Sequence, residues 1–224
     1  MPCETSTEIT PLPIIELQFP YVAATLPADH GYALYGAISR RLPDIHTADW
    51  IAIATIPGGA AGRGVMIPDP DATLRMRLPL ERVPLVRRLA GEILDLNGHS
   101  LTLGDPWLTS LHPSTRLDAR IVTIRGFTEP EPFLAAIRRK LDDLGVMAAI
   151  QPGPRRVVRI AHQTVVGFAV SLRDLDQRGS LTLQEIGIGG RRRVGCGILI
   201  APARPSPDPH QEDRVIVLSR GLSS

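Results

Sequence analysis

The order in which strands and helices are expected along the chain is the feature that most restricts its fold. The first half predicts a strand, a helix, two strands, a second helix and a last strand built as a hairpin. These elements are expected at residues 14–19, 28–42, 50–56, 73–78, 79–90 and 93–103. Asn97-Gly98 favours a tight turn inside the hairpin. Residues 73–78 alternate apolar and basic side chains, so Arg75 and Arg77 are expected to face solvent.

The second half of the chain predicts the same order of elements. They are expected at residues 119–124, 129–144, 155–160, 164–172, 180–186 and 197–201. Thr128 and Glu131 have the spacing of a capping box at the start of the longer helix, and Ser180 is expected to cap the shorter one. Two such series in succession predict an α+β fold with two tandem ferredoxin-like (βαββαβ, RRM-like) domains.

Four segments of the chain follow from this organisation. We expect a flexible lead-in, an N-terminal domain, a C-terminal domain and a proline-rich tail, at residues 1–13, 14–112, 113–202 and 203–224.

Composition excludes several classes of protein. With 43% hydrophobic and 21% charged residues, the chain is not expected to be disordered. No apolar run approaches the roughly 18 residues that cross a bilayer, and the N-terminus lacks the pattern of a secretory signal, so no membrane partner is expected. Cys3 and Cys196 do not make a disulfide framework, which favours a cytoplasmic location. Two cysteines and six scattered histidines have no metal-ligand spacing, so we expect no metal and no cofactor.

Positive charge is concentrated in one part of the chain. Residues 155–204 contain nine arginines and three acidic residues, a net charge of +6, whereas residues 1–110 have a net charge of −4. All basic residues except Lys140 are arginines, whose planar guanidinium groups can bind a phosphate through two hydrogen bonds. A local basic surface of this kind predicts contact with phosphates.

A glycine-rich stretch at residues 187–197 is the densest local signal. Its glycines and arginines are Gly187, Gly189, Gly190, Arg191, Arg192, Arg193, Gly195 and Gly197. Exposed amides between guanidinium groups are suited to cradle phosphate oxygens. The stretch matches neither the dinucleotide-binding spacing of glycines nor a lysine-containing P-loop. The residues alone leave two interpretations open, a clamp for a nucleic-acid backbone and a solvated turn.

Three further arginines are expected to extend this surface, Arg155, Arg156 and Arg159. Arg156 and Arg159 lie three residues apart along a strand, so they are expected on opposite faces of it.

The glycine-rich stretch resembles the C-terminal signature of CRISPR-associated repeat-processing endoribonucleases of the repeat-associated mysterious protein (RAMP) superfamily. Residues 26–37, 121–128 and 183–185 are similar to one branch of that family, and the resemblance covers residues 14–201. It implies two ferredoxin-like domains, binding of a CRISPR repeat RNA hairpin and one metal-independent cut in each repeat. It also implies a protein that can stay on its mature guide RNA within a multi-subunit CRISPR effector complex.

The same resemblance implies a catalytic histidine in or near the first helix, which corresponds to His30. Without a metal, RNA is cut by its own 2′-hydroxyl, which requires proton transfer and stabilisation of charge at phosphorus. The start of a helix disfavours an imidazolium, which suits a neutral base, while the role of acid stays open. His46, in the following loop, is the strongest competitor, and Tyr32 and Tyr35 are expected to pack in the core.

Two other functions stay open. One is a non-catalytic RNA-binding subunit of a CRISPR effector complex, and the other is a ferredoxin-like protein whose loop binds a small anion. The leading hypothesis requires that a histidine from the first half and the glycine-rich stretch from the second half meet at one surface.

Overall fold

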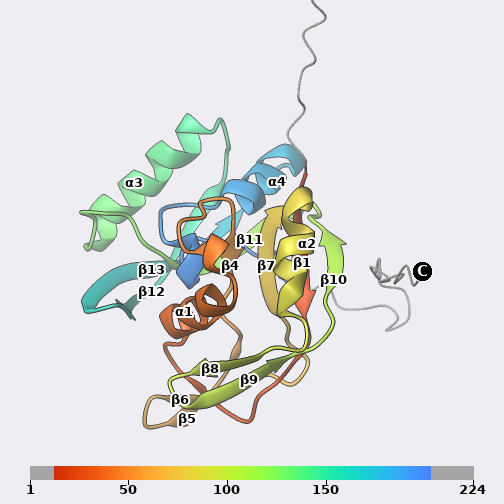
Figure 1. Ribbon diagram of the computed structural model, residues 1–224. Coiled ribbons are helices and arrows are strands. Elements are labelled where there is room, and N and C mark those ends of the chain that lie inside the picture. Colours follow the sequence, from red (N-terminus) through yellow and green to blue (C-terminus); the bar gives the residue numbers. More distant parts are fainter. Residues whose placement is uncertain (1–12, 203–224) are drawn as a thin grey trace, which may run out of the picture.

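The computed structural model describes residues 13–202 (Figure 1). The expected lead-in, apart from Pro13, and the expected tail lie outside the described residues, as does Cys3. No helix among residues 13–202 is long and apolar enough to cross a membrane.

Four antiparallel strands form the sheet of the first half. They are β1 (Ile14–Phe19), β4 (Ala52–Ile53), β7 (Leu74–Pro79) and β10 (Trp107–Ser110). Their spatial order is β10-β1-β7-β4. Helix α1 (Gly31–Arg41) connects β1 to β4, and a short helical segment that includes α2 (Val83–Val86) follows β7. This is the βαββαβ order of a ferredoxin-like domain, as predicted.

The last strand of this half is β10, so the prediction that the 93–103 hairpin supplies it is wrong. The hairpin does form, as β8 (Ile93–Leu96) and β9 (His99–Leu103), but it pairs with β2 (Tyr21–Val22) in a separate sheet. Its alternating leucines give a strong strand signal because they are buried against the first core. The side chains of β10 are only partly buried, and they show no such alternation.

A third small sheet holds the segment that enters α1. It contains β3 (Leu26–Pro27), β5 (Gly58–Gly62) and β6 (Val65–Pro68), in the order β3-β6-β5. Ala28 N–H donates to the Gly64 carbonyl at 2.8 Å, which continues this pairing towards the start of the helix. In Figure 1 both small sheets lie below α1, away from the second half of the chain.

Three long strands and two helices form the second half. They are β11 (Arg116–Val122), α3 (Pro130–Asp143), β12 (Ala149–Ile160), β13 (Gln163–Arg173) and α4 (Gln177–Ile186). The sheet order is β11-β13-β12, and the expected final strand is reduced to one bridge between Ile200 and Asp118 of β11. With that bridge the order matches the first sheet, so the second ferredoxin-like prediction is also confirmed.

The helix caps differ from those predicted. Helix α4 is capped by Asp176, whose Oδ1 accepts from Gly179 N–H at 2.6 Å. Ser180 is inside this helix, and its Oγ accepts from Ser114 N–H at 2.9 Å instead. The N-cap residue of α3 is Glu129, with no side-chain capping bond. Asp176 is a strong N-cap residue and begins α4 three residues earlier than expected, so both capping predictions are wrong.

Each half has its own core of buried apolar side chains. The first core contains residues between Ile15 and Leu103, and the second contains residues between Leu117 and Leu199. In the second core the rings of Phe133 and Phe168 lie 4.7 Å apart. The predicted boundary near residue 112 falls between the two cores, and it stays a prediction.

The second half covers the face of the first sheet that lies opposite its helices. Ala52 and Ala54 pack there against Ile198. Arg77 points to the same face and is only 2% exposed. The prediction that Arg77 faces solvent is therefore wrong, because alternation along one strand cannot show that another part of the chain covers its polar face.

Two β-bulges bend the sheet of the second half at one point. Between Phe168 and Val170 of β13 there is one residue, Ala169, whereas both neighbouring strands have two residues opposite it. Bulges of this kind bend a strand and increase its twist. Beyond the bend, Val158 and Val165 pack against Cys196 rather than against the helices. The outer part of the β12–β13 hairpin, which carries the three arginines, is thereby turned towards the glycine-rich stretch.

Candidate nucleic-acid interface

The glycine-rich stretch, called the glycine loop below, is residues 187–197, between α4 and the final segment. Its two ends lie side by side, since Ile188 N–H donates to the Gly197 carbonyl at 3.0 Å. Gly187 and Gly197 both have a φ of +69°, and a Cβ on either would lie within 2.4 Å of a backbone oxygen. Only glycine fits both requirements at these positions. The base of the loop is buried, and its exposed tip is formed by residues 189–191.

The glycine loop contacts the first half at the start of α1. A Cβ on Gly31 would lie 2.4 Å from the Val194 carbonyl oxygen, and a Cβ on Gly195 would lie 2.5 Å from Thr55 Cγ2. Both glycines therefore allow a close approach between the two halves. The glycine loop thus packs against α1, which begins directly after His30, whereas the meeting of a histidine and the loop around one RNA strand stays a prediction.

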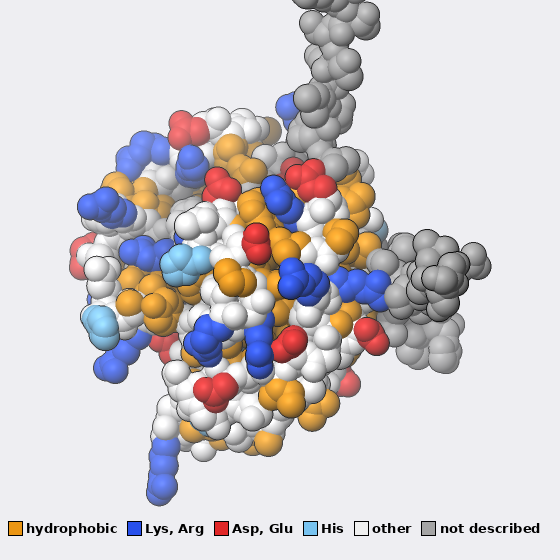
Figure 2. Space-filling view, viewed as in Figure 1, with side chains coloured by type: hydrophobic (Ala, Val, Ile, Leu, Met, Phe, Trp, Pro, Cys, Tyr) orange, Lys and Arg blue, Asp and Glu red, His pale blue; other side chains and the backbone are white. Residues whose placement is uncertain are grey.

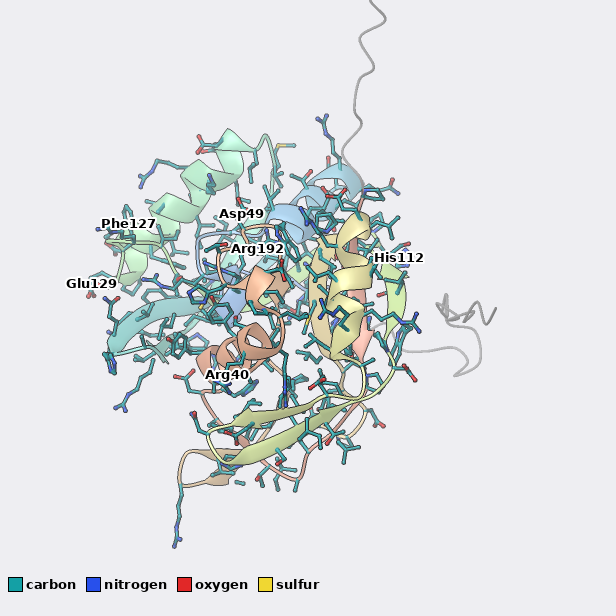
Figure 3. The ribbon with its side chains drawn as sticks, in the orientation of Figure 1. Arg40, Asp49, His112, Phe127, Glu129 and Arg192 are labelled. Carbon is teal, nitrogen blue, oxygen red and sulfur yellow. The ribbon has the colours of Figure 1, made fainter. Side chains whose placement is uncertain are left out.

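The three loop arginines have different surroundings. Arg191 is exposed, and its side chain makes no hydrogen bond or ion pair with the described residues. Arg192 turns back and donates to the Glu185 carbonyl at 2.5 Å, and burial lowers the pKa of its guanidinium. Arg192 is labelled in the central part of Figure 3. Arg193 donates to the His46 carbonyl and lies over the Tyr35 ring, 5.5 Å from its centroid. Arg191 is thus the loop arginine most available to a phosphate. Arg192 instead links the loop to the last turn of α4, which the sequence did not reveal.

The hairpin arginines Arg155, Arg156 and Arg159 are all exposed. Strand alternation places Arg156 on the face of Val158, which packs towards Cys196, and Arg159 on the opposite face. Arg159 N–H donates to Asp29 Oδ2 at 2.6 Å, which ties the hairpin to the segment before α1. Basic side chains are spread over this side of the molecule, with apolar and histidine side chains between them (Figure 2).

Arg120 is a basic residue at this surface that the sequence analysis missed. It lies in the bulge of β11 and is exposed. Burial of part of its side chain and the nearby Arg156 guanidinium lower the pKa of Arg120, while Asp29 acts in the opposite direction. Its position in an alternating strand is visible in the sequence, but the bulge that turns it towards Arg156 is not.

His30 is the N-cap residue of α1, and it is only 1% exposed. Its Nδ1 lies 3.0 Å from the Pro27 carbonyl oxygen, and its Nε2 accepts from Ile56 N–H at 2.9 Å. Because a carbonyl can only accept and an amide N–H can only donate, the imidazole is neutral with its proton on Nδ1. Burial lowers the pKa of His30. Both nitrogens are occupied, so its catalytic role stays a prediction that requires the bond to Ile56 to open.

His46 differs from His30 because its ring is exposed and makes no hydrogen bond with the described residues. It follows α1 and stacks on Tyr35, with ring centroids 6.4 Å apart and planes 20° apart. The Tyr35 hydroxyl donates to the His46 carbonyl at 2.9 Å. Tyr35, His46 and Arg193 form the His46 cluster, which joins α1 to the glycine loop. Tyr32 is 40% exposed, so its predicted packing in the core is wrong, whereas Tyr35 does pack at the edge of the first core.

Other titratable groups at the site are less suited to chemistry. Cys196 is fully buried beneath the glycine loop, and burial raises the pKa of its thiol to about 11, so the thiol is protonated at neutral pH. Among residues 13–202, no group of three histidine, cysteine or acidic side chains is placed to hold a metal ion.

Two solved structures share the fold of this chain. One solved structure, "CRISPR associated protein Cas6", matches with a TM-score of 0.61 at 12% identity, over 85% of this chain and 100% of that one. Another, "An RAMP protein binding different RNA substrates", matches with a TM-score of 0.63 at 10% identity, over 84% of this chain and 100% of that one. At these identities the likeness concerns the fold alone.

Sequence comparison identifies the family. The family model Cas6, described as "Cas6 Crispr", matches residues 15–204. The "CRISPR-associated endonuclease Cas6" of Myxococcus xanthus (strain DK1622) is 38% identical over 190 residues, which are 85% of this chain and 82% of that protein. The chain belongs to the Cas6 family of CRISPR-associated endonucleases. The predicted resemblance and the predicted enzyme class are thereby confirmed.

Proposed function

We propose that this protein cuts CRISPR precursor RNA within each repeat to give mature guide RNA, without a metal ion. The 2′-hydroxyl of the nucleotide before the cut attacks the adjacent phosphorus. The P–O bond to the 5′-oxygen of the next nucleotide breaks, which leaves a 2′,3′-cyclic phosphate and a 5′-hydroxyl. One observation carries the proposal: the glycine loop of the second half packs against α1 of the first half, and Arg193 of the loop donates to the His46 carbonyl there.

His46 is the histidine that the geometry favours for proton transfer. Histidine is the side chain that exchanges protons most readily near neutral pH. Proton transfer by one such side chain typically raises the rate of a reaction about 10²- to 10⁴-fold. The ring of His46 is exposed beside Arg193, whose positive charge is placed to stabilise a developing phosphorane. His30, predicted from the resemblance, has no free nitrogen while its bonds to Pro27 and Ile56 are intact.

RNA binding is assigned to the glycine loop and the outer β12–β13 hairpin. Arg191, Arg155, Arg156 and Arg159 are exposed, and together with Arg120 they supply positive charge beside α1. Contacts to a repeat hairpin are made mainly to its backbone, because side chains cannot read the narrow major groove of duplex RNA. We place the reaction in the cytoplasm, and we assign the mature guide RNA and other subunits of a multi-subunit effector complex as further partners.

Cleavage of a labelled repeat RNA from the same genome tests the reaction. We expect cleavage in EDTA, a cyclic-phosphate product, and no cleavage when the nucleotide before the cut is 2′-deoxy. His46→Ala should lower the single-turnover rate about 10²- to 10⁴-fold while the hairpin affinity stays within twofold. A requirement for Mg²⁺ would overturn the mechanism.

The matched variant is His30→Gln, which can keep one hydrogen bond at the same position. It should cleave at close to the normal rate once folding has been verified by circular dichroism. Loss of cleavage in His30→Gln together with normal cleavage in His46→Ala would return the catalytic role to His30.

The non-catalytic RNA-binding subunit stays as a second candidate because the predicted histidine is buried and fully hydrogen-bonded. Under that function the wild-type protein binds the repeat hairpin tightly but does not cut it, and neither histidine variant changes this result.

A further inference from the structure

Arg77 of β7 is a buried arginine that reaches from the first half into the second. Its Nη1 donates to two backbone carbonyls, that of Gln184 at 2.7 Å and that of Leu199 at 2.6 Å. Its Nε donates to Glu16 Oε2 on β1 at 3.1 Å. Arg77 is 2% exposed and Glu16 is 3% exposed, so these bonds are shielded from water.

The two carbonyls bound by Arg77 lie on either side of the glycine loop. Gln184 is in the last turn of α4, three residues before Gly187, and Leu199 lies two residues after Gly197. One nitrogen of one guanidinium therefore holds both ends of the loop. Lysine cannot reproduce this arrangement, because its ammonium cannot present the same fixed fork of donors to two carbonyls and a carboxylate.

The remaining bonds at the base of the loop are made within the second half. Ile188 N–H donates to the Gly197 carbonyl at 3.0 Å, and Gly197 N–H donates to the Ile121 carbonyl of β11 at 2.8 Å. Arg192 donates to Glu185, next to the carbonyl that Arg77 binds. These bonds close the loop but do not set its position relative to β7. Arg77 supplies that link, and its positive charge also lies at the C-terminal end of α4, where a cation is favoured.

We infer that Arg77 is the positioning residue of the glycine loop, which holds both ends of the loop in place so that Arg191 and the His46 cluster share one surface. The inference rests on the proposed RNA-binding function of the loop. Arg77 itself is too buried to touch RNA. It acts on binding through the loop, and its removal weakens binding without removing a phosphate contact.

The chain offers a matched control in Arg75, which donates to the other oxygen of Glu16 at 2.6 Å but holds no loop carbonyl. The experiment compares Arg77→Lys with Arg75→Lys in the full-length protein. Both variants keep a positive charge beside Glu16, so the buried carboxylate is not left unpaired. Two quantities are measured: hydrogen exchange of the amides of Ile188 and Gly197, and affinity for a repeat RNA hairpin at several salt concentrations.

For Arg77→Lys we expect roughly tenfold weaker hairpin binding, the scale of one lost charged hydrogen bond. Exchange at Ile188 and Gly197 should be faster than in the wild type, while the slope of log affinity against log salt is unchanged. Arg191→Ala serves as the contrast, because loss of a phosphate contact lowers that slope by about 0.7–0.9. Arg75→Lys should stay within twofold of the wild type in both affinity and loop exchange.

Unchanged loop exchange in Arg77→Lys would overturn the inference, as would equal effects of the two lysine variants. Faster exchange spread evenly over both cores would also overturn it, because it would show a general loss of stability. The proposed function fails separately, if the wild-type protein does not bind the repeat hairpin. The exchange measurement needs no RNA and still decides whether Arg77 positions the loop.

Discussion

Replacement of Gly31 by alanine tests the contact between the two halves most directly. In a helix, alanine is more favourable than glycine by up to about 1 kcal/mol. At Gly31, however, a Cβ would lie 2.4 Å from the Val194 carbonyl oxygen and 3.3 Å from Thr55 Cγ2. The backbone of the glycine loop has to move, and overpacking of this kind costs about 1–3 kcal/mol. We therefore expect Gly31→Ala to lower the free energy of unfolding by about 1–2 kcal/mol.

Gly36→Ala in the same helix is the control, since a Cβ there meets only the flexible end of Arg40, at 3.6 Å. It should raise stability by about 0.5–1 kcal/mol. Urea unfolding of both variants gives the free energies, and binding of a repeat RNA hairpin reports the position of the loop. Gly31→Ala should bind more weakly, and Gly36→Ala should bind normally. If Gly31→Ala were as stable as Gly36→Ala, the loop would not pack against α1 as described.

Three further predictions follow from the structure. Burial holds the pKa of His30 in the folded protein below its ordinary value of 6.5. The contribution of neutral His30 to the free energy of unfolding is therefore complete above about pH 6.5 and is lost as the pH falls through the folded-state pKa. Urea midpoints from pH 7.5 to 5 should fall less in His30→Gln than in the wild type, and an identical fall would contradict the assignment. Asp176→Ala should lower stability by about 1 kcal/mol through loss of the α4 cap, whereas Asp176→Asn keeps a capping oxygen and should have little effect on the urea midpoint. Asp29→Asn should increase hydrogen exchange at Arg159, whose N–H it accepts, and unchanged exchange there would show that the hairpin is held by other contacts.

Local patterns predicted most of the elements of the fold. The helical spacing of buried Leu34 and Ile38 identified α1, and the Asn97-Gly98 turn identified the β8–β9 hairpin. Strand β10 was missed because its side chains are partly buried without alternation, and the hairpin before it gave a stronger signal. The helix caps were misplaced because several residues near each helix start are good caps, and only packing selects among them.

The functional site was predicted in part. The glycine loop stood out because five glycines in eleven residues indicate a backbone with positive φ angles, which glycine adopts most readily. Four of the five glycines do have a positive φ. The individual roles of its arginines were not visible. Arg191 and Arg192 are neighbours in sequence, but Arg191 is exposed and Arg192 donates to the Glu185 carbonyl.

By itself, the sequence determined the class of fold, the basic second half and the position of the glycine loop, because each depends on residues close together in the chain. Only the tertiary structure decided that Arg77 is buried, that His30 has both nitrogens occupied and that His46 lies beside Arg193. These properties depend on which surfaces of the two halves meet. A residue's own neighbours in sequence carry no information about a partner 100 or more positions away, such as Leu199 for Arg77.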